Sequence, residues 1–260
     1  MQFVGLDLAW SVRNPSGGAV VRLDGAAGDL TASALLGDDA DVMAFLDRHV
    51  GASGGCLVAV DAPLAVPNAA GRRPAEAALG TVFARFHAGA HPTNRARVAD
   101  AAGSVRGERV VAALAERGFV HDPWLHARAE VRRVVEVYPH PAMVSLFGLS
   151  RTLKYKNKGQ GRALLDAAWA ELYGHLRALE TAEPALRGLD ALLATDPTTL
   201  RGRALKDHED RVDAVVCAYI ALYAWWWGAA RTEVFGTLEG GSILTPTLPE
   251  RWPGARTAAS

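Results

Sequence analysis

Three acidic residues stand in or beside apolar runs that have the character of buried strands. Asp7 lies within residues 2–10, Asp61 directly follows the run 56–60, and Glu136 lies near the end of a third run in VVEVYPHP. Burying a carboxylate is unfavourable unless an opposite charge or hydrogen bonds compensate it. Acids at such positions therefore indicate a site that uses their charge.

Two more acids, Asp210 and Asp213, open a long predicted helix in DHEDRVDAVVCAY. Residues three apart on a helix are rotated by roughly 60° and displaced by about 4.5 Å, so both carboxylates can face one site. Several carboxylates at one sheet edge repel each other, and a divalent cation removes that conflict. Oxygen ligands without thiolate or imidazole partners favour Mg²⁺ or Mn²⁺. Two such ions about 3.5–4 Å apart can activate a water and stabilise the leaving oxygen of a phosphodiester.

Each of these acids except Asp7 can also be weighed as a structural residue. Asp210 can be a first-turn acid favoured by the helix dipole, and Asp61 can be a turn residue. Glu136 can pair with a neighbouring arginine, either Arg132 or Arg133. Helix capping explains Asp213 poorly, because apolar residues follow it directly.

The elements that would position these acids follow from hydrophobic patterning. Three short strands joined by tight turns within residues 2–35 predict an antiparallel meander. The runs 56–60 and 131–137 are typical of strands buried on both faces. Helical spacing predicts helices over 38–50, 161–180 and 204–227, and a hairpin follows over 233–244. The fold class is therefore mixed α/β, with antiparallel strands at one edge of the sheet.

The segment 67–130 differs in composition from the rest of the chain. It is rich in alanine and arginine and is interrupted by several prolines. We interpret it as a helical insertion within a single domain that spans residues 1–260.

The motifs GLDLAW, VAVDAPLAVPN, VEVYPHP with the later LKYK, and DHEDRVDAVVCAY together resemble domain-of-unknown-function family 429. This family consists of predicted nucleases with a ribonuclease H-like fold, and it is similar to Holliday-junction resolvases. Those enzymes carry an acid in the first strand, an acid ending the fourth strand, and Asp-x-x-Asp-Ala at the start of the last helix. The resemblance implies a ribonuclease H-like mixed sheet and assigns those roles to Asp7, Asp61, Asp210 and Asp213. Leu8 stands where members often have glycine, which implies a narrower mouth to the site.

A basic segment, LKYKNKGQGR, lies between the third apolar run and a predicted helix. It contains Lys154, Lys156, Lys158 and Arg162, with Tyr155 between the first two. Such a loop can hold phosphates while the tyrosine stacks on a base. The alternative is an ordinary solvated loop.

The overall composition limits the classes of partner. The chain has 28 Lys and Arg against 28 Asp and Glu, which argues against a polybasic nucleic-acid binder and predicts a short footprint. Cys56 and Cys217 lie in apolar runs, as buried thiols of a reducing cytoplasm do. The sequence shows no signal peptide and no segment typical of a membrane span. The consecutive residues Trp225, Trp226 and Trp227 cannot all enter one core, so a homodimer contact is one alternative for them.

These observations predict a metal-dependent nuclease acting on DNA or RNA. Asp7 would bridge two Mg²⁺ or Mn²⁺ ions, Asp61 with Asp210 or Asp213 would complete the ligands, and Glu136 would be an outer ligand or proton acceptor. Two alternatives remain. An actin- or sugar-kinase-like phosphotransfer or ATP-binding protein predicts a glycine-rich phosphate turn after the first strand and a second copy of the domain. A non-catalytic nucleic-acid- or protein-binding module predicts that metal does not bind.

Overall fold

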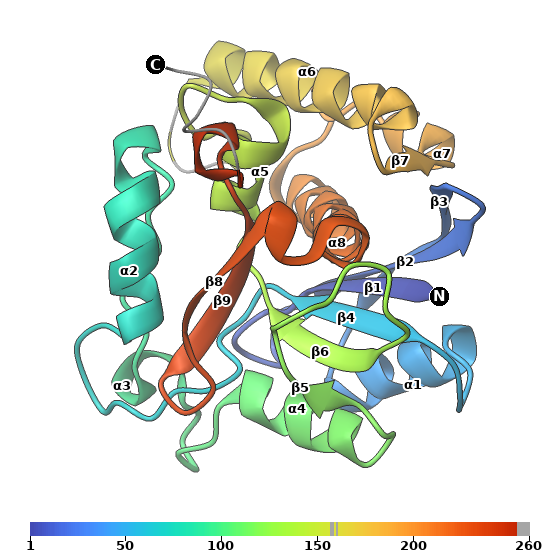
Figure 1. Ribbon diagram of the computed structural model, residues 1–260. Helices are drawn as coiled ribbons and strands as arrows, with labels where there is room; N and C mark the ends of the chain where they lie inside the picture. Colours follow the sequence, from blue (N-terminus) through green and yellow to red (C-terminus); the bar gives the residue numbers. More distant parts are fainter. Residues whose placement is uncertain (157–158, 160, 254–260) are drawn as a thin grey trace.

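A seven-stranded mixed sheet forms the centre of the molecule, and helices cover both of its faces (Figure 1). This computed structural model describes residues 1–156, 159 and 161–253. The strand order is β5-β6-β4-β1-β2-β3-β7. The strands are β1 (Gln2–Asp7), β2 (Ser16–Asp24), β3 (Ala27–Leu36), β4 (Cys56–Val60), β5 (Val120–His121), β6 (Arg132–Glu136) and β7 (Ala185–Arg187). The first three strands pair as an antiparallel meander, whereas β4 and β6 run parallel to β1. The mixed α/β fold class predicted from the sequence is confirmed.

Alternation along each strand divides the core into two layers. Phe3, Leu57 and Val135 pack in one cluster with the long helix α8 (Gly202–Trp227). Their neighbours in sequence face the opposite side, where α1 (Asp39–His49) and α4 (Arg106–Ala115) cover the sheet. The other helices are α2 (Pro74–Phe83), α3 (Arg95–Val98), α5 (Pro139–Phe147), α6 (Arg162–Ala178) and α7 (Asp190–Leu193). A separate hairpin consists of β8 (Thr232–Thr237) and β9 (Gly241–Pro246).

Two glycines let the backbone of α8 lie directly on the sheet. A Cβ on Gly5 of β1 would be 1.9 Å from the carbonyl oxygen of Ala214, and a Cβ on Gly17 of β2 would be 1.8 Å from that of Asp210. No side chain fits such gaps, since real Cβ atoms do not approach backbone so closely. The glycines therefore fix the height of the acidic turn of α8 above the strands.

The helix α8 with its short extension, Gly202–Ala230, is long and apolar enough to cross a membrane by length and composition. Almost all of it is buried inside the protein, as expected of the core helix of a soluble globular protein. Trp225 and Trp226 are both buried, and the indole of Trp225 packs on Phe3 and donates to the carbonyl oxygen of Ala129 at 2.7 Å. These two tryptophans therefore present no dimer surface.

The segment 67–130 contains α2, α3 and α4, as its helical interpretation predicts, and also β5, which adds an edge strand to the main sheet. Its status as an insertion stays a prediction. Helix α5 was not predicted from the sequence, and it contains Pro139 and Pro141 in its first turn. Proline is tolerated in the first turn of a helix, whose amides lack intrahelical partners, so the same residues also begin α5.

Candidate acidic site

The strand register brings Asp7 and Asp61 to the same edge of the sheet. Leu6 pairs with Val60 across the parallel strands β1 and β4, and the amide of Asp61 donates to the carbonyl oxygen of Leu6 at 2.8 Å. By alternation, Asp7 follows Gly5 on the α8 side of the sheet, and Asp61 follows Ala59 on that side. The predicted convergence of these two acids is therefore a consequence of pleat and register.

Helix α8 adds Asp210 and Asp213 to the same place, and both are buried, at 3 % and 0 % exposure. Burial and the charges of the other three aspartates raise the pKa of Asp7 well above its ordinary value, against an opposing effect of Lys156. Burial likewise raises the pKa of Asp61 to about 7. The structure thus brings together all four aspartates that the sequence pointed to.

Two lysines enter this acidic cluster. The Nζ of Lys156 lies 2.6 Å from Oδ2 of Asp213, whose other oxygen accepts a hydrogen bond from the hydroxyl of Tyr155. Lys206 pairs with Asp210 one turn along α8. The surrounding carboxylates raise the pKa of Lys156 well above its ordinary value despite its burial, so it carries a proton at neutral pH. Lys156 is the counter-ion of a buried aspartate and also lines a cavity of the site. Its contact with a nucleic-acid backbone stays a prediction.

Asp7 and Asp61 are left without such compensation. Neither carboxylate accepts a hydrogen bond or joins an ion pair within residues 1–156, 159 and 161–253. No three His, Cys, Asp or Glu side chains of the described residues are grouped closely enough to hold a metal ion as the chain stands. The donor chemistry nevertheless fits a hard divalent cation, because two adjacent carboxylates offer oxygen ligands and join no ion pair within the described residues, although the charge of Lys156 acts on both. Asp210 and Asp213, predicted as further ligands, already have lysine partners.

Glu136 belongs to a different, closed network. Its oxygens accept hydrogen bonds from Nη2 of Arg73 at 2.5 Å, from Nη1 of the same arginine at 2.9 Å, and from the amide of Leu64 at 2.9 Å. The suggested pairing with Arg132 or Arg133 was therefore wrong. Glu136 nevertheless lies near the acidic cluster, because it lines a small cavity of about 90 Å³ together with Asp61, and its charge contributes to the raised pKa of Asp61.

Two cavities meet at Asp7. The larger, of about 720 Å³, is lined by Asp7, Asp61, Trp10, Lys154 and Lys156 among others. Lys154 is exposed, as its predicted role in contacting phosphates requires.

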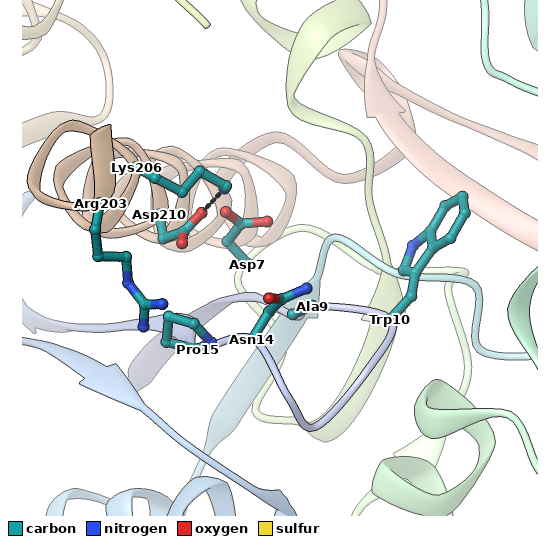
Figure 2. Close-up of a pocket in the computed structure, with 8 residues that line it drawn as sticks. All are labelled: Asp7, Ala9, Trp10, Asn14, Pro15, Arg203, Lys206 and Asp210. Carbon is teal, nitrogen blue, oxygen red and sulfur yellow. Dashed lines mark hydrogen bonds and ion pairs between the residues drawn. The ribbon is translucent and has the colours of Figure 1, made fainter. Parts of the chain in front are cut away.

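The smaller cavity, of about 380 Å³, is lined by Asp7, Asp210, Lys206, Arg203 and Trp10 among others. Figure 2 shows Lys206 and Asp210 on α8 beside Asp7, with Arg203 and Trp10 at opposite ends of the view. Arg203, Lys206 and Trp10 were not singled out from the sequence. The first two could have been found, because Arg203 and Lys206 precede Asp210 by seven and four residues on one helix face.

Arg162, another predicted backbone contact, does not line these cavities. Arg162 donates to the carbonyl oxygens of Pro197 and Leu200 and pairs with Asp166, so it joins α6 to a neighbouring loop. Lys158 lies outside the described residues.

Comparison with known proteins places these observations in a family. The model of a family described as Protein of unknown function (DUF429) matches residues 5–235, a range that contains all four clustered aspartates. No curated protein and no solved structure gives a significant match.

Proposed function

The chain belongs to the DUF429 family, and we propose that it is a divalent-metal-dependent nuclease that hydrolyses phosphodiester bonds of nucleic acid. One observation supports this most directly. Asp7 and Asp61 lie at the ends of adjacent parallel strands, join no ion pair within the described residues, and line a cavity that lysines also line. Ligands commonly bind outside the carboxyl ends of the strands of an open α/β sheet. A structural acid at such a place would be expected to have a partner.

Within this proposal, Asp7 and Asp61 hold Mg²⁺ or Mn²⁺ through their carboxylate oxygens. The bound ion supplies a water of lowered pKa and stabilises negative charge on the phosphate. The positions of the two acids at strand ends make them rigid, because their backbones are held by the ladder of β1 and β4.

Within this proposal, Lys156 and Lys206 supply positive charge on two sides of the site. Lys156 keeps its proton and presents an ammonium group to the cavity, where it can neutralise a phosphate oxygen. Asp213 holds that ammonium in place at 2.6 Å, and Asp210 does the same for Lys206 on the other side. Asp210 and Asp213 are therefore assigned to orienting cations of the protein rather than to binding the metal directly.

The two cysteines bear on the location of the protein. Cys56 and Cys217 are both free and buried, as expected in a reducing compartment, and we infer a cytoplasmic location. The choice between DNA and RNA is left to the cleavage assay.

The test combines metal binding with cleavage. Thermal unfolding is followed with and without Mn²⁺ or Mg²⁺, and fluorescent DNA and RNA oligonucleotides are incubated with the protein and each metal. A ligand at a hundred times its dissociation constant stabilises the native state by about 2.7 kcal/mol, which is about 5 °C or more for a chain of this size. Asp7→Asn should remove both the shift and the cleavage.

Asp24→Asn is the matched control, because Asp24 also ends a strand of the meander but is exposed at the opposite end of β2. It should behave as the wild type does. The proposal fails if neither metal shifts the melting temperature, the result that a non-catalytic binding module predicts. It fails equally if Asp7→Asn cleaves as fast as the wild type.

A further inference from the structure

The loop after β1 presents a tryptophan at the mouth of both cavities. Trp10 exposes 46 % of its surface although it lies three residues from Asp7. It lines the larger cavity with Asp61 and the smaller one with Asp210. An indole left this exposed gains little from the folded core, so its placement calls for another explanation.

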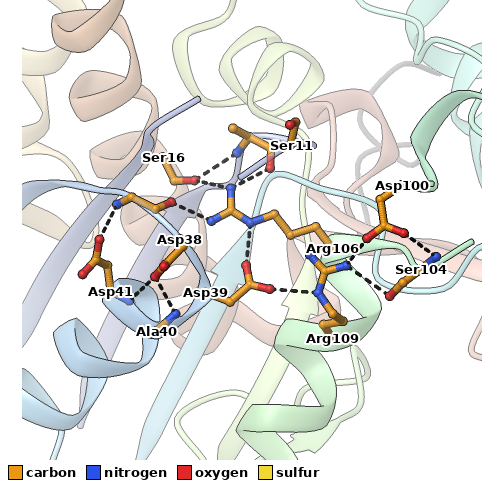
Figure 3. A network of polar contacts seen from close by, with 12 residues as sticks. Ser11, Ser16, Asp38, Asp39, Ala40, Asp41, Asp100, Ser104, Arg106 and Arg109 are labelled. Carbon is orange, nitrogen blue, oxygen red and sulfur yellow. Dashed lines mark hydrogen bonds and ion pairs between the residues drawn. The ribbon is translucent and has the colours of Figure 1, made fainter. Parts of the chain in front are cut away.

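The backbone that carries Trp10 is held firmly. The guanidinium of the buried Arg106 donates to the carbonyl oxygen of Ala9 at 2.9 Å, and the amide of Ala9 donates to Oγ of Ser16 at 3.1 Å. Arg106 is itself paired with Asp39 at 2.7 Å, which ties the loop to α1 and α4 (Figure 3). The indole therefore projects from a fixed point.

The lining of the larger cavity contains further aromatic rings. Tyr138 and His140 both line it, and their rings meet edge to face with centroids 5.5 Å apart. Burial, with a contribution from the charge of Asp61, raises the pKa of Tyr138 to about 12, so its hydroxyl keeps its proton at neutral pH. The cavity thus combines aromatic surfaces, two lysines and two carboxylates.

We propose that the larger cavity binds an unpaired nucleotide of single-stranded nucleic acid, with its base stacked on Trp10 and its phosphate near Lys154 and Lys156. This inference rests on the proposed nuclease function only in taking the phosphate beside Asp7 and Asp61 as the one that is cleaved. A cavity of about 720 Å³ is within the range of pockets that enclose a ligand of nucleotide size. A base within a duplex keeps its faces covered by its neighbours and cannot stack on an indole inside a pocket. Stacking on an aromatic ring tolerates every base, so binding should show little sequence preference.

The test measures binding without cleavage. Fluorescein-labelled eight-nucleotide oligo(dT) and oligo(U) are titrated with the full chain in EDTA and again in Ca²⁺, and the tighter condition is used for comparison. A hairpin duplex of similar length and an oligo(dT) with abasic positions are the competitor arms. The single strands should bind more tightly than both the duplex and the abasic strand.

Trp10→Ala should weaken single-strand binding by about 5- to 150-fold, the range measured for loss of one base-stacking contact. Trp10→Phe should keep most of the affinity. Trp124→Ala is the matched control, because Trp124 is equally exposed, at 50 %, and lines neither cavity. Circular dichroism spectra of all three variants establish that they are folded.

The inference is overturned if the duplex or the abasic strand competes as well as the intact single strand, or if Trp10→Ala binds as Trp124→Ala does. Single-strand binding that depends on Trp10 but is never followed by cleavage would refute the nuclease and leave this inference standing. Metal-dependent cleavage of duplex with no effect of Trp10→Ala would support the nuclease and refute this inference.

Discussion

Replacement of Glu136 by glutamine tests the assignment of this acid to a structural network rather than to catalysis. The carboxylate is 4 % exposed and accepts three hydrogen bonds, two from Arg73 and one from the amide of Leu64. Glutamine keeps the shape but loses the charge and turns an NH₂ group toward a donor. Removing one partner of a buried ion pair costs about 3–5 kcal/mol. Glu76 still pairs with Nε of Arg73 at 2.9 Å, so we expect the lower end, about 3 kcal/mol.

For a chain of this size that loss corresponds to a fall in melting temperature of about 6–12 °C. Urea unfolding at pH 7 in EDTA gives the free energy, with Glu250→Gln as the control. Glu250 also pairs with an arginine at 2.5 Å, but Arg85 and Glu250 are 63 % and 57 % exposed, so the change should cost less than about 1 kcal/mol. If Glu136→Gln is as stable as the wild type but has lost its response to Mn²⁺, Glu136 is a metal ligand and the structural assignment is refuted.

Two further predictions concern the contact of α8 with the sheet and the charge of the site. Gly17→Ala places a Cβ 1.8 Å from the carbonyl oxygen of Asp210 and should lower the free energy of unfolding in urea by about 1–3 kcal/mol. The control Gly174→Ala, in open space on α6, should raise it by about 0.5–1 kcal/mol. Equal effects of the two substitutions would contradict the close approach of α8 to the sheet. The pKa of Asp61 is raised to about 7 in the folded protein. Between about pH 4 and 7, Asp61 therefore holds a proton in the folded metal-free protein but has lost it in the unfolded chain. The contribution of Asp61 to the free energy of unfolding thus falls as the pH rises through this range. Melting curves in EDTA should therefore show that the melting temperature of Asp61→Asn rises relative to that of the wild type from pH 5 to 8. A difference in melting temperature that stays constant over this range would disprove the pKa shift.

Much of the fold could be predicted because its strands are long enough to show a period. The run 56–60 coincides with β4, and the meander and the helix α8 were found within a few residues of their ends. The strands β5 and β7, of two and three residues, are too short for any periodicity to identify. Their pairing is decided by the neighbouring strand and not by their own residues.

The candidate site was predictable in its acids and only in part in its cations. Acids at the ends of adjacent parallel strands share an edge, so the meeting of Asp7 with Asp61 follows once β1 and β4 pair in parallel. The partner of Glu136 is 63 residues away in Arg73, a contact that no local pattern encodes. Lys156 lies in a loop, where residue spacing does not determine direction, so its insertion beside Asp213 could not be foreseen.

The balance of charge at the site explains why its acids behave differently. Four carboxylates converge, but among the described residues only Asp210 and Asp213 have a lysine within ion-pair distance. A cluster selected for stability alone would pair or neutralise the other two, since uncompensated buried charge weakens the folded state. The strand-end positions of Asp7 and Asp61, together with the lysines held at their sides, leave one unmet requirement, which is for positive charge. A divalent ion held by Asp7 and Asp61 would supply that positive charge only when it is bound, and a gain that depends on binding is what a catalytic site needs and a structural one does not.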